Sequence, residues 1–234
     1  MEDGDLLRPT WKPAEAILAI VAVFGLAGIL SIPIFLAVRS EETELLLGAI
    51  VFGVALFAVP VLWVRFLHRQ PVSSLGLSSR RPARDLLAGA AAGLALFLLT
   101  VIVVAPAIYA LITLFTGDPV TPPSQPILPD KPSSWQIAIG AVAAVGVAPV
   151  AEEAFFRGFL FGALRSRYRF PIAAAISGVV FGAFHIIPLL IPLMVFVGIG
   201  LAYIYERRGS LLASIAAHSA FNVIGYTLIV QNIT

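Results

Sequence analysis

The chain contains no cysteine, and charged residues are scarce. Without cysteine it can form no disulfide framework, thiolate metal site or cysteine nucleophile. Only 12% of the 234 residues are charged, about half the share of a soluble domain, whereas 59% are hydrophobic. A chain of this length cannot bury so much apolar surface in a water-soluble core. The composition therefore predicts a protein whose natural solvent is a lipid bilayer.

Seven apolar segments are candidates for membrane-spanning helices. Their approximate ranges are 16–38, 45–64, 86–115, 135–164, 170–187, 188–205 and 210–230. The third and fourth are longer than one crossing needs, and Pro106 and Pro149 could kink them. We predict an all-α, polytopic membrane protein with about seven transmembrane helices in one bundle, or eight if a long segment contains a re-entrant turn.

Basic residues are distributed unevenly between the two ends of these segments. If the N-terminus is cytoplasmic, the inside segments hold twelve arginines and lysines, and the outside loops hold only Arg39 and Lys131. This bias predicts a multi-pass protein of the cell inner (cytoplasmic) membrane with its N-terminus in the cytoplasm. The arginines lie in short loops beside the membrane, where they contact membrane lipids, so the basic charge does not indicate nucleic acid as a partner. The acidic start lacks the basic region of a secretory signal.

Polar side chains occur inside the last apolar segments. They are Glu152, Glu153 and Arg157 in the fourth segment, His185 in the fifth, and His218 and Asn222 in the last. Counted by helical rise from the cytoplasmic ends, Glu152, His185, His218 and Asn222 lie about 12 to 22 Å deep in a hydrocarbon layer about 30 Å thick. Ionisable groups at that depth are costly and usually functional. Because all these polar groups lie in the last segments, we divide the single membrane domain into an N-terminal part, residues 1–134, and a catalytic core, residues 135–234. The N-terminal part ends in a proline-rich outer loop, residues 116–134.

Helical spacing sets which of these side chains can meet. Three pairs stand one turn apart, at i and i+4: Glu153 with Arg157, Phe181 with His185, and His218 with Asn222. The first pair has the favourable order for an ion pair. Glu152 points about 100° away from Glu153, so the two carboxylates need not share a partner.

These residue types suit the hydrolysis of a peptide bond. A glutamate can activate a water, a histidine can move a proton, and an amide can stabilise an oxyanion. Glu152, His185 and His218 would also suffice as three ligands of a catalytic zinc with an open fourth position. Each residue has a structural interpretation as well: a structural ion pair for Glu153 and Arg157, interhelical hydrogen bonds for the histidines and Asn222, and packing for Phe181.

Three motifs stand in order along the second part of the chain. Glu152-Glu153-Ala-Phe-Phe-Arg157 has the pattern EExxxR, Phe181-Gly-Ala-Phe-His185 has the pattern FxxxH, and His218-Ser-Ala-Phe-Asn222 has the pattern HxxxN. Over about residues 135–230 they resemble the CPBP family, which groups type II CAAX prenyl endopeptidases with bacteriocin-processing and immunity proteins. The resemblance implies an all-helical intramembrane endopeptidase.

The resemblance also implies roles for the motif residues. Glu152 would activate the water, with His185 as its partner in proton handling or metal binding. His218 and Asn222 would stabilise the oxyanion, or His218 would complete a zinc site, so both a zinc and a metal-free mechanism stay open. Glu153 and Arg157 would organise the site, and Phe181 would shape it.

The substrate implied is a peptide or a lipidated protein at the membrane. Prenylated termini, peptide pheromones, bacteriocin precursors and membrane-protein termini are the candidates. Two other functions remain open: a proton-coupled transporter in which Glu152, His185 and His218 relay protons, and a non-catalytic immunity or scaffold protein of the same fold.

Overall fold

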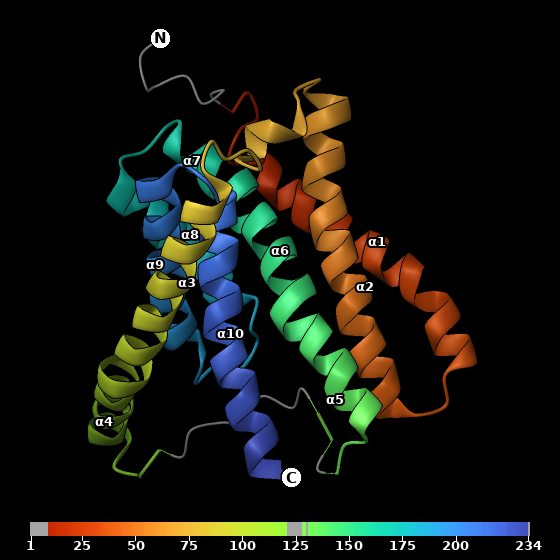
Figure 1. Ribbon diagram of the computed structural model, residues 1–234, viewed down its shortest axis with the longest axis vertical. Helices are drawn as coiled ribbons and strands as arrows, with labels where there is room; N and C mark the ends of the chain where they lie inside the picture. Colours follow the sequence, from red (N-terminus) through yellow and green to blue (C-terminus); the bar gives the residue numbers. More distant parts are fainter. Residues whose placement is uncertain (1–8, 121–127, 130, 234) are drawn as a thin grey trace.

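The computed structural model describes residues 9–120, 128, 129 and 131–233, which form a bundle of helices (Figure 1). No strand occurs among these residues. Several of the helices are long and apolar enough to cross a bilayer. The prediction of an all-α, multi-pass membrane protein is therefore confirmed. The acidic N-terminus, Arg8 and part of the proline-rich outer loop lie outside the described residues.

The first two helices, α1 (Glu15–Ala37) and α2 (Glu41–Leu62), pack against each other as an antiparallel hairpin. Ser40 begins α2 as its N-cap, because its hydroxyl accepts a hydrogen bond from the Thr43 N–H. The helix continues as a π-helical segment, η1 (Trp63–Leu67), and a short 3₁₀ turn follows, η2 (Val72–Leu75).

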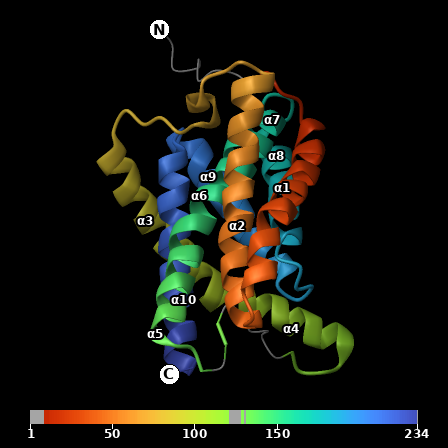
Figure 2. The same cartoon turned by 90° about the vertical axis from the view of Figure 1, so that its right-hand side faces the viewer.

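The third apolar segment is one long helical run that changes direction. It consists of α3 (Pro82–Leu99), the π-helical η3 (Thr100–Val104) and α4 (Ala105–Thr116). Figure 2 shows α4 turning away from the direction of α3. Pro106 lies at the start of α4 and has no N–H to continue the helical ladder, which accounts for the predicted kink at this place.

The fourth apolar segment is the central helix of the bundle and lies between α2 and α10 (Figure 1). It is built from α5 (Ser134–Ala141), η4 (Val142–Val147), α6 (Ala148–Glu152), η5 (Glu153–Phe161) and α7 (Gly162–Arg165), of which η4 and η5 are π-helical. Pro149 lies at the start of α6, directly after η4. The two glutamates therefore stand at a junction between α- and π-helical geometry.

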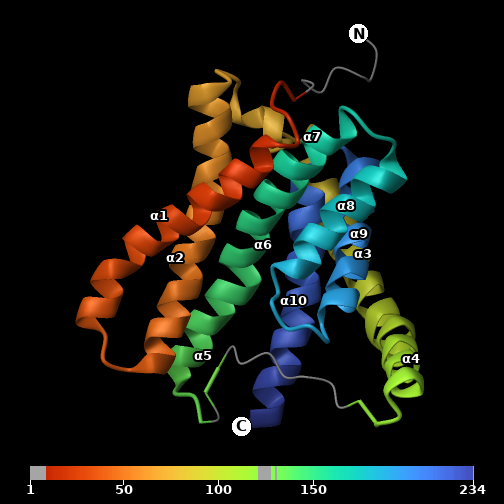
Figure 3. The same ribbon diagram turned by 180° about the vertical axis from the view of Figure 1, so that it is seen from behind.

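The last three helices are α8 (Phe170–Ala183), α9 (Ile191–Arg208) and α10 (Leu211–Ile233). Helices α8 and α9 form a closely packed hairpin, seen from behind in Figure 3. The expectation that His185 lies within a helix was wrong, because α8 ends at Ala183 and His185 lies in the following turn. Ile186 has a positive φ of 62°, which prevents the helix from continuing through the turn, and Pro188 lies two residues later.

Among the described residues, five helices are long and apolar enough to cross a membrane. They are Glu15–Ala37, Glu41–Leu67, Pro82–Thr116, Ser134–Arg165 and Leu211–Asn232. The two predicted spans at 170–187 and 188–205 are helical, but α8 is shorter than a crossing helix and α9 ends in the charged residues Glu206, Arg207 and Arg208. The predicted count of seven spans therefore depends on whether α8 and α9 each cross the membrane.

Small residues bring α3 and α10 close together. A Cβ on Gly89 would meet the backbone of Ala213, and a Cβ on Gly93 would meet the backbone of Ala217, one turn further along both helices. Gly178 and Gly182 likewise let α8 approach α9. These contacts agree with the close helix packing expected for such glycine pairs. Because Ala217 directly precedes His218, the packing of α3 sets the position of that histidine.

Candidate active site

A buried ion pair lies at the centre of the bundle, at the start of η5. Glu153 and Arg157 are both fully buried, and the Arg157 Nη1 lies 3.0 Å from the Glu153 Oε1, as their spacing predicted. The Arg157 Nη2 donates to the carbonyl of Gly198 on α9 over 3.3 Å. Its guanidinium also lies over the Phe181 ring of α8, 4.4 Å from the centroid. One arginine thus joins three helices around a charge that would be costly to bury unpaired.

His218 of α10 lies between the two glutamates. Its Nδ1 is 3.0 Å from the Glu153 Oε1, and its Nε2 is 3.8 Å from the Glu152 Oε2. The two carboxylates do share a partner despite pointing in different directions, because an imidazole has a nitrogen on each edge. An ionised Glu153 can only accept, so Nδ1 carries the hydrogen and a neutral His218 presents the Nε2 lone pair to Glu152.

Glu152 has an unsatisfied oxygen that faces this lone pair. Its Oε2 is buried and has no hydrogen-bond partner among the described residues, although the side chain as a whole is 21% exposed. The separation of 3.8 Å is too long for a direct hydrogen bond to His218. Two acceptors therefore face each other across a gap that a molecule with two donors can bridge.

Phe181 connects the second histidine to this group. Its buried ring lies 5.8 Å from the His218 ring and 4.9 Å from the His185 ring, measured between centroids. The His185 Nδ1 donates to the Phe181 carbonyl over 3.0 Å, so a neutral His185 keeps a lone pair on Nε2. In the described part of the chain, no hydrogen bond or ion pair joins His185 to either glutamate.

Asn222 forms a bond that the sequence did not predict. Its Nδ2 donates to the carbonyl of Ala144 in η4 over 2.7 Å. No backbone N–H occupies the Ala144 carbonyl, for two reasons. The Ala148 N–H donates to the carbonyl of Ala143 instead, and the next residue, Pro149, has no N–H to donate to Ala144. The bond uses one of the two amide hydrogens of Asn222, and the second remains for another acceptor.

Two further side chains bind carbonyls of η5, and the motif analysis missed both. Ser177 of α8 donates to the carbonyl of Phe156 over 3.2 Å, and Trp11 donates through Nε1 to the carbonyl of Phe159 over 2.8 Å. Both side chains are about 1% exposed. A serine one turn before Phe181 in an apolar helix was the available signal for Ser177. No sequence pattern indicates the π-helical geometry that these bonds accompany.

The residues considered for zinc do not fit a metal site as they are arranged. Among the described residues, no three His, Cys, Asp or Glu side chains come together in a group that could hold a metal ion. Glu152 and His218 do face each other, but the contacts of His185 are with Phe181. No chemical step is therefore derived through a metal, and zinc dependence stays a prediction.

The comparisons with known proteins bear on this segment. No curated protein and no solved structure matches the chain. Among family models, residues 134–224 match the one described as "Type II CAAX prenyl endopeptidase Rce1-like". The matched segment begins with α5, ends in α10 two residues after Asn222, and contains every residue of the three motifs. The resemblance predicted from the motifs is thus confirmed: over residues 134–224 the chain is similar to the Rce1-like type II CAAX prenyl endopeptidases.

Proposed function

We propose that this protein is an intramembrane endopeptidase that hydrolyses a peptide bond of a membrane-associated peptide or protein. The observation that carries the proposal is the pair of acceptors formed by the Glu152 Oε2 and the His218 Nε2, 3.8 Å apart. The family match over the same segment supports the reaction class.

A water molecule between these two atoms would be held for attack. It would donate one hydrogen to each acceptor, which directs an oxygen lone pair away from both of them. The Glu153 carboxylate orients the imidazole through Nδ1, and Arg157 holds that carboxylate in place. Glu153 and Arg157 therefore act as positioning residues, and Glu152 acts as the general base.

In the hydrolysis that we propose, Glu152 carries one proton from the attacking water to the leaving amine. The water oxygen bonds to the carbonyl carbon of the substrate while Glu152 takes its proton, which leaves a tetrahedral oxyanion. When the intermediate collapses, the C–N bond breaks and Glu152 gives the same proton to the leaving amine. The free amide hydrogen of Asn222 is suited to donate to the oxyanion. His185 can accept a proton through the lone pair on Nε2.

The family match supports a lipidated or membrane-associated peptide as the substrate class. We also propose that the arginine-rich end of the bundle faces the cytoplasm. The connections α2–α3, α7–α8 and α9–α10 lie at this end, at the top of Figure 1. These connections and the helix ends beside them carry ten of the fifteen basic residues: Arg65, Arg69, Arg80, Arg81, Arg84, Arg165, Arg167, Arg169, Arg207 and Arg208.

Replacement of Glu152 by glutamine tests the proposal. The change keeps the shape of the side chain and removes the base, so we expect cleavage to fall about 10²- to 10⁴-fold. The measurement is cleavage of a fluorogenic prenylated peptide and its unprenylated twin by protein purified in detergent, with and without a zinc chelator. The chelator arm decides the metal question independently of the base.

Glu41→Gln is the matched control, since Glu41 is an exposed glutamate at the start of α2. It should cleave as the wild type does. Cleavage in detergent, where no proton gradient exists, would exclude proton-coupled transport as the main function. Equal cleavage by wild type and Glu152→Gln would overturn the role of Glu152, and failure of wild type to cleave either peptide would contradict this substrate class.

A further inference from the structure

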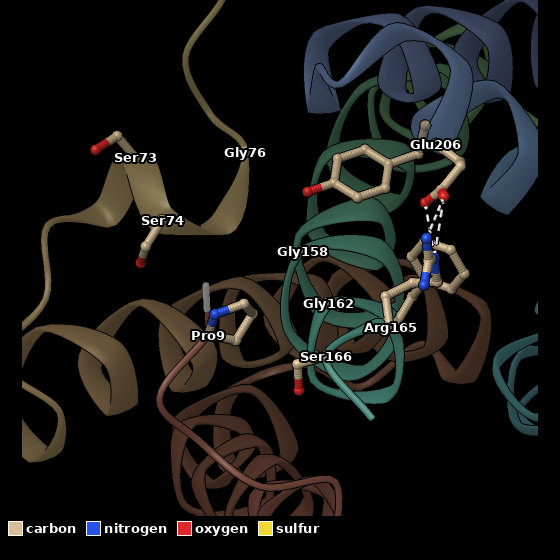
Figure 4. A pocket seen from close by; sticks show the side chains of 11 residues that line it. Pro9, Ser73, Ser74, Gly76, Gly158, Gly162, Arg165, Ser166 and Glu206 are labelled. Atoms are coloured by element: carbon tan, nitrogen blue, oxygen red, sulfur yellow. Dashed lines mark hydrogen bonds and ion pairs between the residues drawn. The ribbon is translucent and has the colours of Figure 1, made fainter. Parts of the chain in front are cut away.

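A polar cavity lies at the arginine-rich end of the bundle, apart from the glutamates. It has a volume of about 500 Å³, within the usual range for ligand pockets of about 300 to 1,000 Å³. Four parts of the chain form its wall: the segment at Pro9, η2 with Gly76, the helix from Gly158 to Ser166, and the end of α9 (Figure 4).

The rim of this pocket is held by backbone contacts. Gly76 has a positive φ of 83° and accepts a hydrogen bond from the N–H of Leu211, the first residue of α10. Gly158 packs against the carbonyl of Leu75 so closely that a Cβ would collide with it. The pocket is therefore part of the folded bundle and does not depend on a free loop.

The pocket carries no free charge. Arg165 and Glu206 form a forked ion pair, with the Arg165 Nη2 2.6 Å and Nε 3.0 Å from the Glu206 Oε1. The remaining nitrogen, Nη1, donates to the carbonyl of Tyr168. Because every nitrogen of this guanidinium is engaged, a phosphate or another anion would find no unpaired cation in the wall. The ligand class that fits is neutral.

Hydroxyl groups supply the hydrogen-bonding capacity of the pocket. Ser74 and Ser166 donate to the backbone carbonyls of Pro71 and Ala163, so their oxygens remain available as acceptors. Within the described chain, the hydroxyls of Ser73 and Tyr205 form no hydrogen bond. The Tyr205 hydroxyl lies beside Gly76, where a Cβ would be 2.5 Å from it. The wall thus offers both donors and acceptors.

We infer that this pocket binds a short, uncharged segment of the peptide substrate through its backbone. A peptide backbone alternates carbonyl acceptors with N–H donors. The unbonded hydroxyls of Ser73 and Tyr205 can donate to its carbonyls, and the oxygens of Ser74 and Ser166 can accept from its N–H groups. Gly158 and Gly162 line the pocket without side chains, so the wall at these positions is backbone. The inference rests on the proposed function, because it takes the bound peptide to be the one cleaved at Glu152.

The position of the pocket defines which part of the substrate it would hold. Gly158 follows Glu152 by six residues, which is at most about 9 Å along the helix, since π-helical geometry rises less per residue than the α-helix. An extended peptide covers that distance in about three residues at about 3.3 Å per residue. The pocket therefore selects a segment that begins about three residues from the scissile bond, on the arginine-rich side.

Binding can be measured without cleavage in a Glu152→Gln background. The probes are two fluorescent prenylated peptides, one with six neutral residues (Ser, Gly and Asn) before the modified cysteine and one with six acidic residues in their place. Fluorescence anisotropy with the full-length protein in detergent gives the dissociation constants. We expect Tyr205→Phe and Ser73→Ala each to weaken binding of the neutral peptide about three- to tenfold, the loss of one hydrogen bond.

Tyr203→Phe is the matched control, because Tyr203 lies on the same helix but is 51% exposed outside the pocket. It should bind the neutral peptide as the parent does. The inference would be overturned if both pocket variants bound the neutral peptide as the parent does, or if the neutral peptide did not bind at all. It would also be overturned if the acidic peptide bound more tightly than the neutral one and Tyr205→Phe did not change that binding. Cleavage by the wild type is scored separately, so failure of the peptidase proposal is distinguishable from failure of the pocket.

Discussion

At the scale of single residues, two carboxylates one position apart in the same helix have different surroundings and should differ in what their loss costs. Glu152 has an unpaired oxygen and a partly exposed side chain, whereas Glu153 is fully buried between Arg157 and His218. The first is placed for chemistry, because its partly exposed side chain is the one that a water and a substrate can approach. The second is placed to hold the imidazole and the guanidinium.

Replacement of Arg157 by methionine should therefore cost stability, whereas Glu152→Gln should cost activity alone. Breaking a buried pair by removing one partner costs about 3 to 5 kcal/mol, since Glu153 would stay charged inside the bundle. The measurement is the free energy of unfolding in detergent, followed by tryptophan fluorescence. Glu152→Gln should unfold within about 1 kcal/mol of the wild type.

The double variant Glu153→Gln with Arg157→Met separates charge from packing. The glutamine oxygen can still accept from the His218 Nδ1, and no unpaired charge remains, so the double variant should be more stable than Arg157→Met alone. A double variant that is less stable than either single one would show that the ion pair itself, and not the burial of a lone charge, sets the stability.

At the scale of helices, the contact between α3 and α10 places His218. Gly93→Ala would put a methyl group against the carbonyl of Ala217 and force the helices apart, at a cost of about 1 to 3 kcal/mol. His218 is the next residue, and a shift of about 1 Å at a catalytic group can lower the rate about 10²-fold. We expect both the unfolding free energy and the cleavage rate to fall.

Gly225→Ala is the control for this change, because a Cβ at Gly225 on the same helix would meet nothing within 4 Å. Alanine is the better helix former by about 0.5 to 1 kcal/mol, so this variant should be as stable as the wild type or more so. If both substitutions had the same effect, the close approach of α3 would not position the site.

The sequence predicted those features of the helices and the site that follow from spacing. The helical ranges and the Glu153–Arg157 pair depend on the composition of one segment and the period of one helix. The bond from Asn222 to Ala144 could not be predicted, because it needs a π-helical segment that leaves a carbonyl free on another helix. The end of α8 at Ala183 was missed because the apolar run continues unchanged through the turn.

At the scale of the whole molecule, the path of the α8–α9 hairpin decides how many times the chain crosses the membrane. No Asp, Glu, Lys or Arg occurs between residues 170 and 205, and arginines flank both ends. With 14 residues, α8 is about 21 Å long, less than a hydrocarbon layer of about 30 Å. Most backbone N–H groups of the turn between the two helices donate to carbonyls nearby in the turn, and Pro188 has no N–H to satisfy. The donors are Phe184, His185, Ile186, Ile187, Leu190 and Ile191.

A turn whose N–H groups are mostly bonded within itself can remain at membrane depth, so we expect five crossings and a hairpin that enters and leaves on the arginine-rich side. The chain has no cysteine, so a single Ile186→Cys variant carries the only thiol. Ile186 is 81% exposed, yet in right-side-out and inside-out vesicles a membrane-impermeant maleimide should leave it unlabelled. Arg167→Cys and Asp118→Cys should each be labelled from one side of the membrane only, and the labelled side should differ between the two variants. Labelling of Ile186→Cys from the Asp118 side would instead establish seven crossings, with α8 and α9 each spanning the bilayer.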